Sequence, residues 1–436
     1  MADLKETAKQ IFLETLRAIE PDSVIANRIR LEGEILNLGS EQVLLDGFKE
    51  VVLIGMGKAS LKMGLALEGL LGSRVSRSIL VTDRYTGISV RSEVVVGGHP
   101  LPDANSLLAG EKIVELVRSC GKETLLIFLI SGGGSALVEL PVSTDISLED
   151  LRITNQILIT CGATIREINL IRKSLSRIKG GGLGRLARNS KCIGLYISDV
   201  NPGDLRSIAS NPLLPEEIDN ETPLELVVKY QLDEKLPRSV VDVLARGFPR
   251  SHERGSDDAG PISMLLLDNS NALEAAAQRA RARGFRVEVR ADLIEGEYRT
   301  VADELLEHLL RMKTSFPNER VCVISGGEVS CPVRGDGIGG RNQEFVLYSA
   351  TRLGCLGMRE GAVVLSCGTD GIDGNSPAAG AVADAELVLN AARLAIDASN
   401  FLSRNDSHTF FKRAGGLVVT GPSGNNVRDL RILMAQ

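Results

Sequence analysis

The sequence has few of the residues and patterns that mark secreted, membrane or zinc proteins. It holds four histidines in 436 residues, and its seven cysteines form no CxxC pair. An odd cysteine count with mostly apolar neighbours is typical of unpaired thiols in a reducing cytoplasm and argues against a zinc site. No apolar stretch approaches the roughly 20 residues that a membrane span needs. We therefore expect a cytoplasmic protein with no membrane partner.

The sequence also has no excess of basic residues and no nucleophile elbow, and its N-terminal pattern is not the one expected of a signal peptide. Lys and Arg total 50 against 56 Asp and Glu, a formal net charge of −6 that argues against nucleic acid as the principal partner. Without a GxSxG motif a Ser/His/Asp hydrolase is a poor fit. Near the N-terminus, Leu4, Ile11, Phe12, Leu16 and Ile19 share one helical face among charged residues, unlike an uninterrupted apolar signal segment.

Apolar runs that alternate with helical patterns predict an α/β fold. VVLIG, ILVT, LLIFLIS and CIGLYIS are continuous enough for parallel strands covered on both faces. The chain is long for one core, so two domains of roughly 200 residues each are expected. We predict two three-layer α/β/α domains, a Rossmann-like one with a mainly parallel sheet over residues 1–245 and a second over 246–436. The boundary falls in a Pro-rich and charged stretch, after which Asp268 or Asn269 caps a new helix that Gly284 ends.

Four strand-like runs end in glycine-rich segments. They are VVLIGMGKAS (51–60), LLIFLISGGGSA (125–136), VCVISGGE (321–328) and VVLSCGTDGIDG (363–374). Glycines at such junctions let backbone amides approach an anion, and a following helix adds its positive end. The pattern predicts a phosphate-handling enzyme, with its site in the cleft between the two domains.

The lysine of GMGKAS is the first candidate residue. The segment is neither a Walker A loop nor a full dinucleotide fingerprint, because Ser60 stands at the third glycine position. A cation at a helix start opposes the helix dipole, so Lys58 invites an anionic ligand. The alternative is a solvated surface lysine.

The segment SGGGSA is the second candidate. Its consecutive glycines can turn several amides toward one point, so we expect a nucleotide phosphate site at Ser131, Gly132, Gly133, Gly134 and Ser135. A plain tight turn is the alternative, and the two serines could instead cap a helix.

The remaining candidates are an arginine, a histidine and several acids. In GIGGRNQEF, the fork of Arg341 can grip a carboxylate or phosphate, or else pair internally with Glu328 or Glu344. Carboxylates at strand ends can hold Mg²⁺ or act as a base, although aspartate is also a common turn residue. His99 is the one histidine in a Gly- and Pro-rich loop beside an expected strand end. The acidic candidates are Asp199 with Asp204, and Asp370 with Asp373.

In their order along nearly the whole chain, these motifs resemble the class II glycerate kinases, the glycerate 2-kinase family whose C-terminal part is the MOFRL domain. The resemblance is carried by GMGKAS, GGHPLPD, ISGGGSALVELP, NLIRKSLSRIKGGGLG, ISDVNPGD, ISGGEVS, GIGGRNQE, TDGIDGNSPAAGA and GGLVVTGPSGNNVRDL. It implies a two-domain enzyme that transfers the γ-phosphoryl group of ATP to D-glycerate with a divalent metal, usually at the 2-hydroxyl. The family's functional Lys and Arg then fall on Lys58 and Arg341. The chain departs from the family at residues 208–213, where it reads IASNPL against IASGPT.

The resemblance gives each candidate a role in phosphoryl transfer. Lys58 would stabilise charge on the γ-phosphoryl group, and Arg341 would hold the glycerate carboxylate or bridge it to the phosphate. Asp199 would bind Mg²⁺ or another divalent cation, or polarise the attacking hydroxyl. Asp370 and Asp373 compete with it as metal ligands, and Gly327, Glu328 and Asp370 complete the expected nucleotide site. Self-association into a homo-oligomer stays open.

Two rival functions remain at this stage. One is an NAD(P)-dependent hydroxypyruvate reductase, against which the incomplete dinucleotide fingerprint speaks. The other is a sensor that binds a sugar phosphate without turnover.

Overall fold

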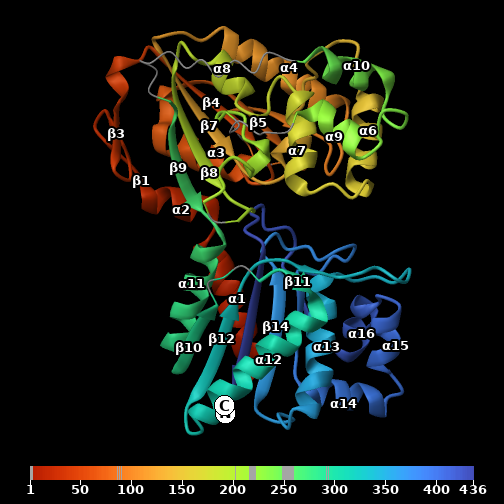
Figure 1. Ribbon diagram of the computed structural model, residues 1–436. Coiled ribbons are helices and arrows are strands. Elements are labelled where there is room, and N and C mark those ends of the chain that lie inside the picture. The colour runs from red at the N-terminus through yellow and green to blue at the C-terminus, as the bar shows by residue number, and fades with distance from the viewer. Residues whose placement is uncertain are drawn as a thin grey trace. The chain divides into compact units, whose positions relative to one another are not determined.

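A computed structural model describes residues 3–85, 87, 89, 91–201, 203–215, 222–247, 260–290, 292 and 294–436. The chain folds into two compact units (Figure 1). We call Val24–Leu266 the inserted unit, and the residues up to Ser23 together with those from Leu267 onward the terminal unit. These bounds differ from the division at 245 and 246, which stays a prediction.

The inserted unit begins at α2, which runs across its boundary. Its elements are α2 (Pro21–Arg28), β1 (Ile29–Glu32), β2 (Ile35–Leu38), β3 (Glu41–Leu44), β4 (Glu50–Met56), α3 (Ser60–Leu71), β5 (Val75–Thr82), β6 (Glu93–Val96), α4 (Ala104–Arg118), β7 (Thr124–Ile130), α5 (Gly134–Leu137), α6 (Leu148–Thr160), α7 (Ile165–Ser174), α8 (Gly182–Leu186), β8 (Lys191–Ile197), α9 (Pro223–Lys229), α10 (Arg238–Arg246) and β9 (Ile262–Leu267). Short 3-10 turns occupy Leu45–Gly47, Gly72–Arg74 and Ile208–Ser210.

The six-stranded sheet of the inserted unit has the order β6-β5-β4-β7-β8-β9, and its pairings from β6 through β8 are parallel. Val52, Ile54 and Met56 alternate along β4 and pack in one buried cluster with Ile113 of α4. Helix α3 contacts β4, β5 and β7. The predicted Rossmann-like sheet with helices on both faces is confirmed. Because β4, β7 and β8 are parallel, their carboxyl ends and the loops that follow lie at one edge.

The terminal unit combines the first helix with the C-terminal part of the chain. Its elements are α1 (Leu4–Ala18), α11 (Asn269–Ala282), β10 (Phe285–Arg290), β11 (Gly296–Glu297), α12 (Tyr298–Ser315), β12 (Arg320–Ser325), β13 (Val329–Ser330), α13 (Arg341–Cys355), β14 (Ala362–Gly368), β15 (Gly380–Ala383), α14 (Ala385–Arg393), α15 (Ala398–Ser403), α16 (Ser407–Ala414), β16 (Leu417–Val418) and β17 (Asp429–Ala435). Asp268 caps α11 as predicted, and Gly284 follows it with a φ of 81°.

The sheet of the terminal unit is mixed, with the order β10-β12-β17-β14-β15-β16. Strand β17 lies antiparallel to both β12 and β14, so β12 and β14 run in the same direction. Successive residues of β12 point alternately into two different hydrophobic cores. Val321 and Val323 pack with α12 and α13, and Cys322 and Ile324 pack with α1 and α11. The predicted three-layer arrangement is therefore present, and the first residue of β17 meets the carboxyl ends of β12 and β14 at one sheet edge.

Among the helices that the structure describes, none is both long and apolar enough to cross a membrane.

Candidate active site

Lys58 lies between β4 and α3 in a loop whose amides are bound within the protein. The amide of Lys58 donates to the oxygen of Gly132 at 3.0 Å, and that of Ala59 donates to Ser131 Oγ at 3.0 Å. Gly57 has a φ of 125°, and a Cβ there would collide with Ser131. These amides are not available to an anion, so the loop serves to fix the lysine backbone against the SGGGSA segment.

Unlike GMGKAS, the SGGGSA segment after β7 has backbone amides that are not bound by any described residue. The amides of Ser131 and Gly134 donate to main-chain oxygens at 3.0 and 3.3 Å. Within the described part of the chain, the amides of Gly132, Gly133 and Ser135 have no acceptor. Gly133 has a φ of 82° and turns the chain immediately before α5. Neighbouring amides left unpaired at such a turn are suited to an anion, and nucleotide binding at this segment stays a prediction.

Three polar side chains surround these glycines. A Cβ on Gly133 would stand 3.3 Å from Cγ of Lys58 and 3.2 Å from Cδ2 of His99. A Cβ on Gly132 would collide with the carboxylate of Asp199. The side chains follow β4, β6 and β8, whose ends share one sheet edge. The structure thus brings Lys58 and Asp199 together with the glycines, and it adds His99, which had been singled out by its loop but given no role.

The departure from the family pattern has a structural use. Asn211 is fully buried; its Nδ2 donates to a main-chain oxygen at 2.7 Å, and its Oδ1 accepts the amide of Leu213 at 2.9 Å. Ser210 just before it has a φ of 55° and places its Oγ 3.1 Å from that of Ser135. The asparagine side chain therefore holds the loop that contacts SGGGSA.

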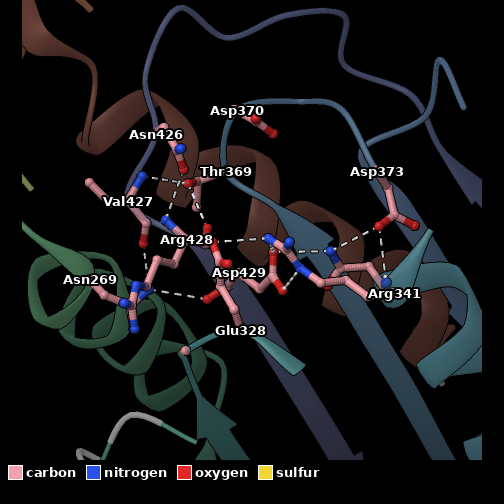
Figure 2. Close-up of polar contacts among 12 residues, drawn as sticks. Asn269, Glu328, Arg341, Thr369, Asp370, Asp373, Asn426, Val427, Arg428 and Asp429 are labelled. Carbon is pink, nitrogen blue, oxygen red and sulfur yellow. Dashed lines mark hydrogen bonds and ion pairs between the residues drawn. The ribbon is translucent and has the colours of Figure 1, made fainter. Parts of the chain in front are cut away.

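In the terminal unit, Arg341 opens α13 and pairs with two carboxylates (Figure 2). Its Nε and Nη2 donate to Asp429 at 2.7 and 3.0 Å, and Nη2 lies 3.1 Å from Oε1 of Glu328. The internal pair with Glu328, weighed as an alternative at the sequence level, is present, and Glu344 is not a partner. Asp429 was not foreseen. Nη1 of Arg341 donates to no acceptor in the described ranges, which leaves it for a ligand.

Asp429 is fully buried between two guanidinium groups. Arg431, also fully buried, lies 3.6 Å away and donates to the oxygen of Gly326 at 2.7 Å. Burial lowers the pKa of Arg431 to about 10 against the pull of Asp429. Burial also lowers the pKa of Arg341, but the charge and hydrogen bonds of Asp429 outweigh it and hold that pKa above its usual value. Asp429 therefore positions Arg341 and keeps it charged.

A buried asparagine supports this pair from the other side of β17. Asn269, at the start of α11, donates from Nδ2 to the main-chain oxygens of Val427 and Asp429 at 2.6 and 3.1 Å. Figure 2 shows Asn269 and Arg341 on opposite sides of Asp429. The amide fixes the chain where it enters β17.

The carboxylate of Asp373 accepts hydrogen bonds from the first turn of α13. Its Oδ1 accepts the amide and Nδ2 of Asn342 at 3.0 and 3.2 Å, and its Oδ2 accepts the amide and Nε2 of Gln343 at 2.9 Å each. The side chain is 1% exposed, and burial raises its pKa to about 6 despite these bonds. Its four hydrogen bonds satisfy the carboxylate, so it does not fit a metal ligand and instead anchors α13.

The other nucleotide candidates of the terminal unit also have internal partners. Asp370 accepts the amide of Ile372 at 3.1 Å, and Glu328 pairs with Arg341. Gly327 has a φ of 91°, and a Cβ there would collide with the backbone of Ile294. This glycine is required by packing, and nucleotide contacts at these three positions stay predictions.

Of the acids expected to hold a divalent cation, Asp373 does not fit, because its carboxylate is saturated by four hydrogen bonds. Metal binding by Asp199 and Asp370 stays a prediction. No group of three or more His, Cys, Asp or Glu side chains among the described residues is arranged to hold a metal ion. We derive no step through a resident metal.

Two family models match this chain. A domain of unknown function, DUF4147, matches residues 7–245, and the MOFRL family model matches residues 321–429. The chain is 31% identical over 434 residues to a D-glycerate 2-kinase of Thermotoga maritima, covering 98% of each sequence. A crystal structure of a glycerate kinase from that organism superposes with a TM-score of 0.84 at 30% identity, covering 99% of both chains. The chain belongs to the MOFRL glycerate kinase family.

Other relatives carry a different name. A putative hydroxypyruvate reductase of Agrobacterium vitis is 38% identical over 392 residues, which is 88% of this chain and 98% of the relative. In this family member, however, the segment nearest to a dinucleotide fingerprint has its amides bound to the SGGGSA segment. Ser60, at the third glycine position, donates from Oγ to Val81 at 2.6 Å. The geometry therefore fits a loop that positions a lysine better than it fits a loop that binds a pyrophosphate.

Proposed function

We propose that the protein is a glycerate 2-kinase, which transfers the γ-phosphoryl group of ATP to the 2-hydroxyl of D-glycerate and yields 2-phospho-D-glycerate and ADP. The observation that carries the proposal is the juxtaposition of Lys58 with the unpaired amides of Gly132, Gly133 and Ser135. The names of the relatives that cover the whole chain support it.

Phosphoryl transfer requires positioning and charge neutralisation more than covalent chemistry by side chains. The free amides of the SGGGSA segment would hold phosphate oxygens, and the Lys58 ammonium would stabilise negative charge on the transferred group. The 2-hydroxyl oxygen forms a bond to the γ-phosphorus as the bond from that phosphorus to the β–γ bridging oxygen breaks. ADP departs with the electron pair. We assign the hydroxyl proton to Asp199, which lies against Gly132.

Arg341 is suited to the carboxylate of glycerate. Asp429 and Glu328 engage its Nε and Nη2, so the guanidinium is oriented before a ligand arrives and can present Nη1. Preorganisation of this kind lowers the entropy lost on binding. A divalent cation such as Mg²⁺ would enter as the metal complex of ATP and neutralise its phosphates.

The cysteines support a reducing compartment for this reaction. All seven are free thiols, and Cys322 and Cys367 are fully buried. We place the enzyme in the cytoplasm.

The decisive assay separates the kinase from its rival. The protein is incubated with ATP, MgCl₂ and D-glycerate, and products are identified by phosphorus NMR, with a parallel tube of NAD(P)H and hydroxypyruvate. We expect a phosphomonoester whose coupling pattern identifies the 2-position. Nicotinamide oxidation without any phosphoester would replace the kinase with a reductase.

Lys58 has a matched control one helical turn further on. We expect Lys58→Ala to lower kcat by about 100-fold or more, in the range found for removal of a group that stabilises transition-state charge. Lys62→Ala removes the same charge from α3 and should leave kcat within about twofold, because surface substitutions away from a site are nearly neutral. Equal turnover of the two variants would remove Lys58 from the mechanism.

A further inference from the structure

The terminal unit contains a pocket that is lined by none of the candidate site residues described above. It has a volume of about 480 Å³ and is lined by residues from α12, α13, α15 and the segment after β13. Helix α13 contacts both α12 and α15, and Figure 1 shows the three helices on the same side of the unit. Pockets of this size hold small organic ligands.

The positive charge of the pocket comes from two arginines that form no ion pair with a described acid, although the charge of Arg299 acts on Glu297 and Glu344. Arg299 and Arg334 both line it, and neither guanidinium has a carboxylate within ion-pair distance among the described residues. The one acidic residue of the lining, Glu297, caps α12 by accepting the amides of Arg299 and Thr300 at 2.9 and 3.2 Å. A second nearby acid, Asp303, is taken by Arg352.

Arg299 is held in one orientation. Its Nε donates to the hydroxyl of Tyr298 at 2.9 Å, and its guanidinium carbon lies 5.3 and 5.7 Å from the ring centres of Tyr298 and Tyr348. The two rings pack edge to face at 6.0 Å. Its terminal nitrogens donate to no described acceptor, so they form a fixed fork of the kind that binds carboxylate and phosphate.

The backbone beneath Arg334 is fixed as well. Asn405 accepts the amides of Arg334 and Gly335 at 2.6 and 3.2 Å and donates to the oxygen of Pro332 at 3.3 Å. A Cβ on Gly335 would collide with the backbone of Arg404, so the segment lies close against the end of α15. The pocket thus carries one arginine whose guanidinium is oriented, Arg299, and a second, exposed arginine whose backbone is fixed, Arg334.

We propose that this pocket is a regulatory site for a small organic oxyanion, a phosphate monoester or a carboxylate whose body fills the volume beyond the two guanidinium groups. The route to activity is α13, because this helix carries Tyr348 and Thr351 in the pocket wall and Arg341 at its first residue. The regulatory part rests on the proposed function, whereas binding does not.

Binding can be measured without activity, because the sequence has no tryptophan and five tyrosines, of which Tyr298 and Tyr348 line the pocket. Inorganic phosphate is titrated against tyrosine fluorescence at constant ionic strength, since the arginine pair must bind the isolated head group whatever the body. We expect saturation in the millimolar range. Glucose 6-phosphate, glucuronate and glucose are then compared, because they share a sugar ring and carry a phosphate, a carboxylate or no charged group. The preferred oxyanion should bind more tightly than inorganic phosphate, and glucose should not bind.

Variants separate this pocket from the catalytic cluster. Arg299→Gln and Arg334→Gln should each weaken binding at least tenfold, since each removes charge-assisted hydrogen bonds. Arg311→Gln, elsewhere on α12, should bind like the parent. Lys58→Ala should also bind normally, which distinguishes failure of this site from failure of the kinase proposal. Thermal unfolding checks that each variant is folded, and Arg299→Lys, which keeps the charge without the fork, should bind with intermediate affinity.

Several results would overturn the proposal. They are no saturable change with phosphate, binding that survives both arginine variants, or sugar derivatives that bind no better than phosphate. If binding is confirmed, kcat or KM for glycerate should change at saturating oxyanion in the parent and not in Arg334→Gln. Unchanged kinetics in both would remove the regulatory role.

Discussion

Replacing Glu344 with glutamine should stabilise the protein at alkaline pH and not at acid pH. Glu344 lies in the first turn of α13, is 1% exposed, and neither carboxyl oxygen has a hydrogen-bond partner in the described part of the chain. Burial dominates and raises the pKa of Glu344 to about 7. The negative charge of Asp373 also raises this pKa. Ser407 and the positive charge of Arg299 lower it.

The sign and size of the effect follow from proton linkage. The unfolded chain releases this proton near pH 4.5 and the folded protein near pH 7. The stabilising contribution of the proton is therefore complete below about pH 4.5 and is lost as the pH rises through about 7. A pKa difference of about 2.5, at about 1.4 kcal/mol for each pKa unit, corresponds to about 3 kcal/mol. Glutamine keeps the shape without titrating, so Glu344→Gln should gain up to about 3 kcal/mol over the parent at pH 8.5 and close to nothing at pH 4.5.

Urea unfolding followed by circular dichroism at pH 4.5 and 8.5 measures this difference, with the transition of the terminal unit fitted separately if the two units unfold apart. Glu386→Gln is the control, because it removes an acid from the first turn of α14 at an exposed position. Asp373, whose pKa burial raises to about 6, leaves some pH dependence in every variant. If the free energies of Glu344→Gln and the parent run parallel from pH 4.5 to 8.5, Glu344 is already ionised in the folded protein and the reasoning is wrong.

Three further substitutions test the described contacts. Asp429→Asn should lower the free energy of unfolding in urea by about 3 kcal/mol or more, because it leaves Arg431 buried without its counter-charge. Asp303→Asn, in the half-exposed pair with Arg352, should lower it by less than about 1 kcal/mol, and equal costs would contradict the role of burial. Gly133→Ala should cost about 1–2 kcal/mol, because its φ is 82°, and should lower kcat by crowding Lys58 and His99, while Gly121→Ala, with open space around it, should not lower kcat; normal turnover of Gly133→Ala would count against the site. Asn269→Ala should cost about 1–3 kcal/mol in the same unfolding assay, because two main-chain oxygens lose their donor, and a change below about 0.5 kcal/mol would show that water replaces it.

The sequence was sufficient to predict strands β4, β5, β7 and β8 of the inserted unit's sheet and its glycine-rich edge, but it assigned the segment of β9 to the second domain, whereas β9 pairs with this sheet. Apolar runs such as β7, buried along its whole length, are local signals, and parallel strands place their following loops together without further information. Lys58, Asp199 and the SGGGSA glycines could therefore be grouped in advance. The role of GMGKAS could not, because only the fold reveals that the amides of Lys58 and Ala59 are bound by the neighbouring loop.

The terminal unit was harder to predict because its decisive pairing is between distant residues. Arg341 and Asp429 are 88 positions apart, and they meet only because β17 enters the sheet antiparallel between β12 and β14. No periodicity in the seven residues of β17 distinguishes a central antiparallel strand from an edge strand. The motif GNNVRDL contributed to the family resemblance, but nothing local in it indicated that its aspartate orients the arginine.

The order of strands in the terminal unit has a consequence for synthesis on the ribosome. Helix α1 emerges first, yet the strands β14 and β17 that its Ile11 and Phe12 pack against follow the entire inserted unit. Strand β17, which joins β12 to β14, is translated after every other strand of that sheet. The inserted unit can thus close its own core during translation, while α1 waits with its apolar face uncovered. Until β17 is made, the nascent chain exposes the edges of β12 and β14, which makes this interval the stage at which it is most exposed to misassembly.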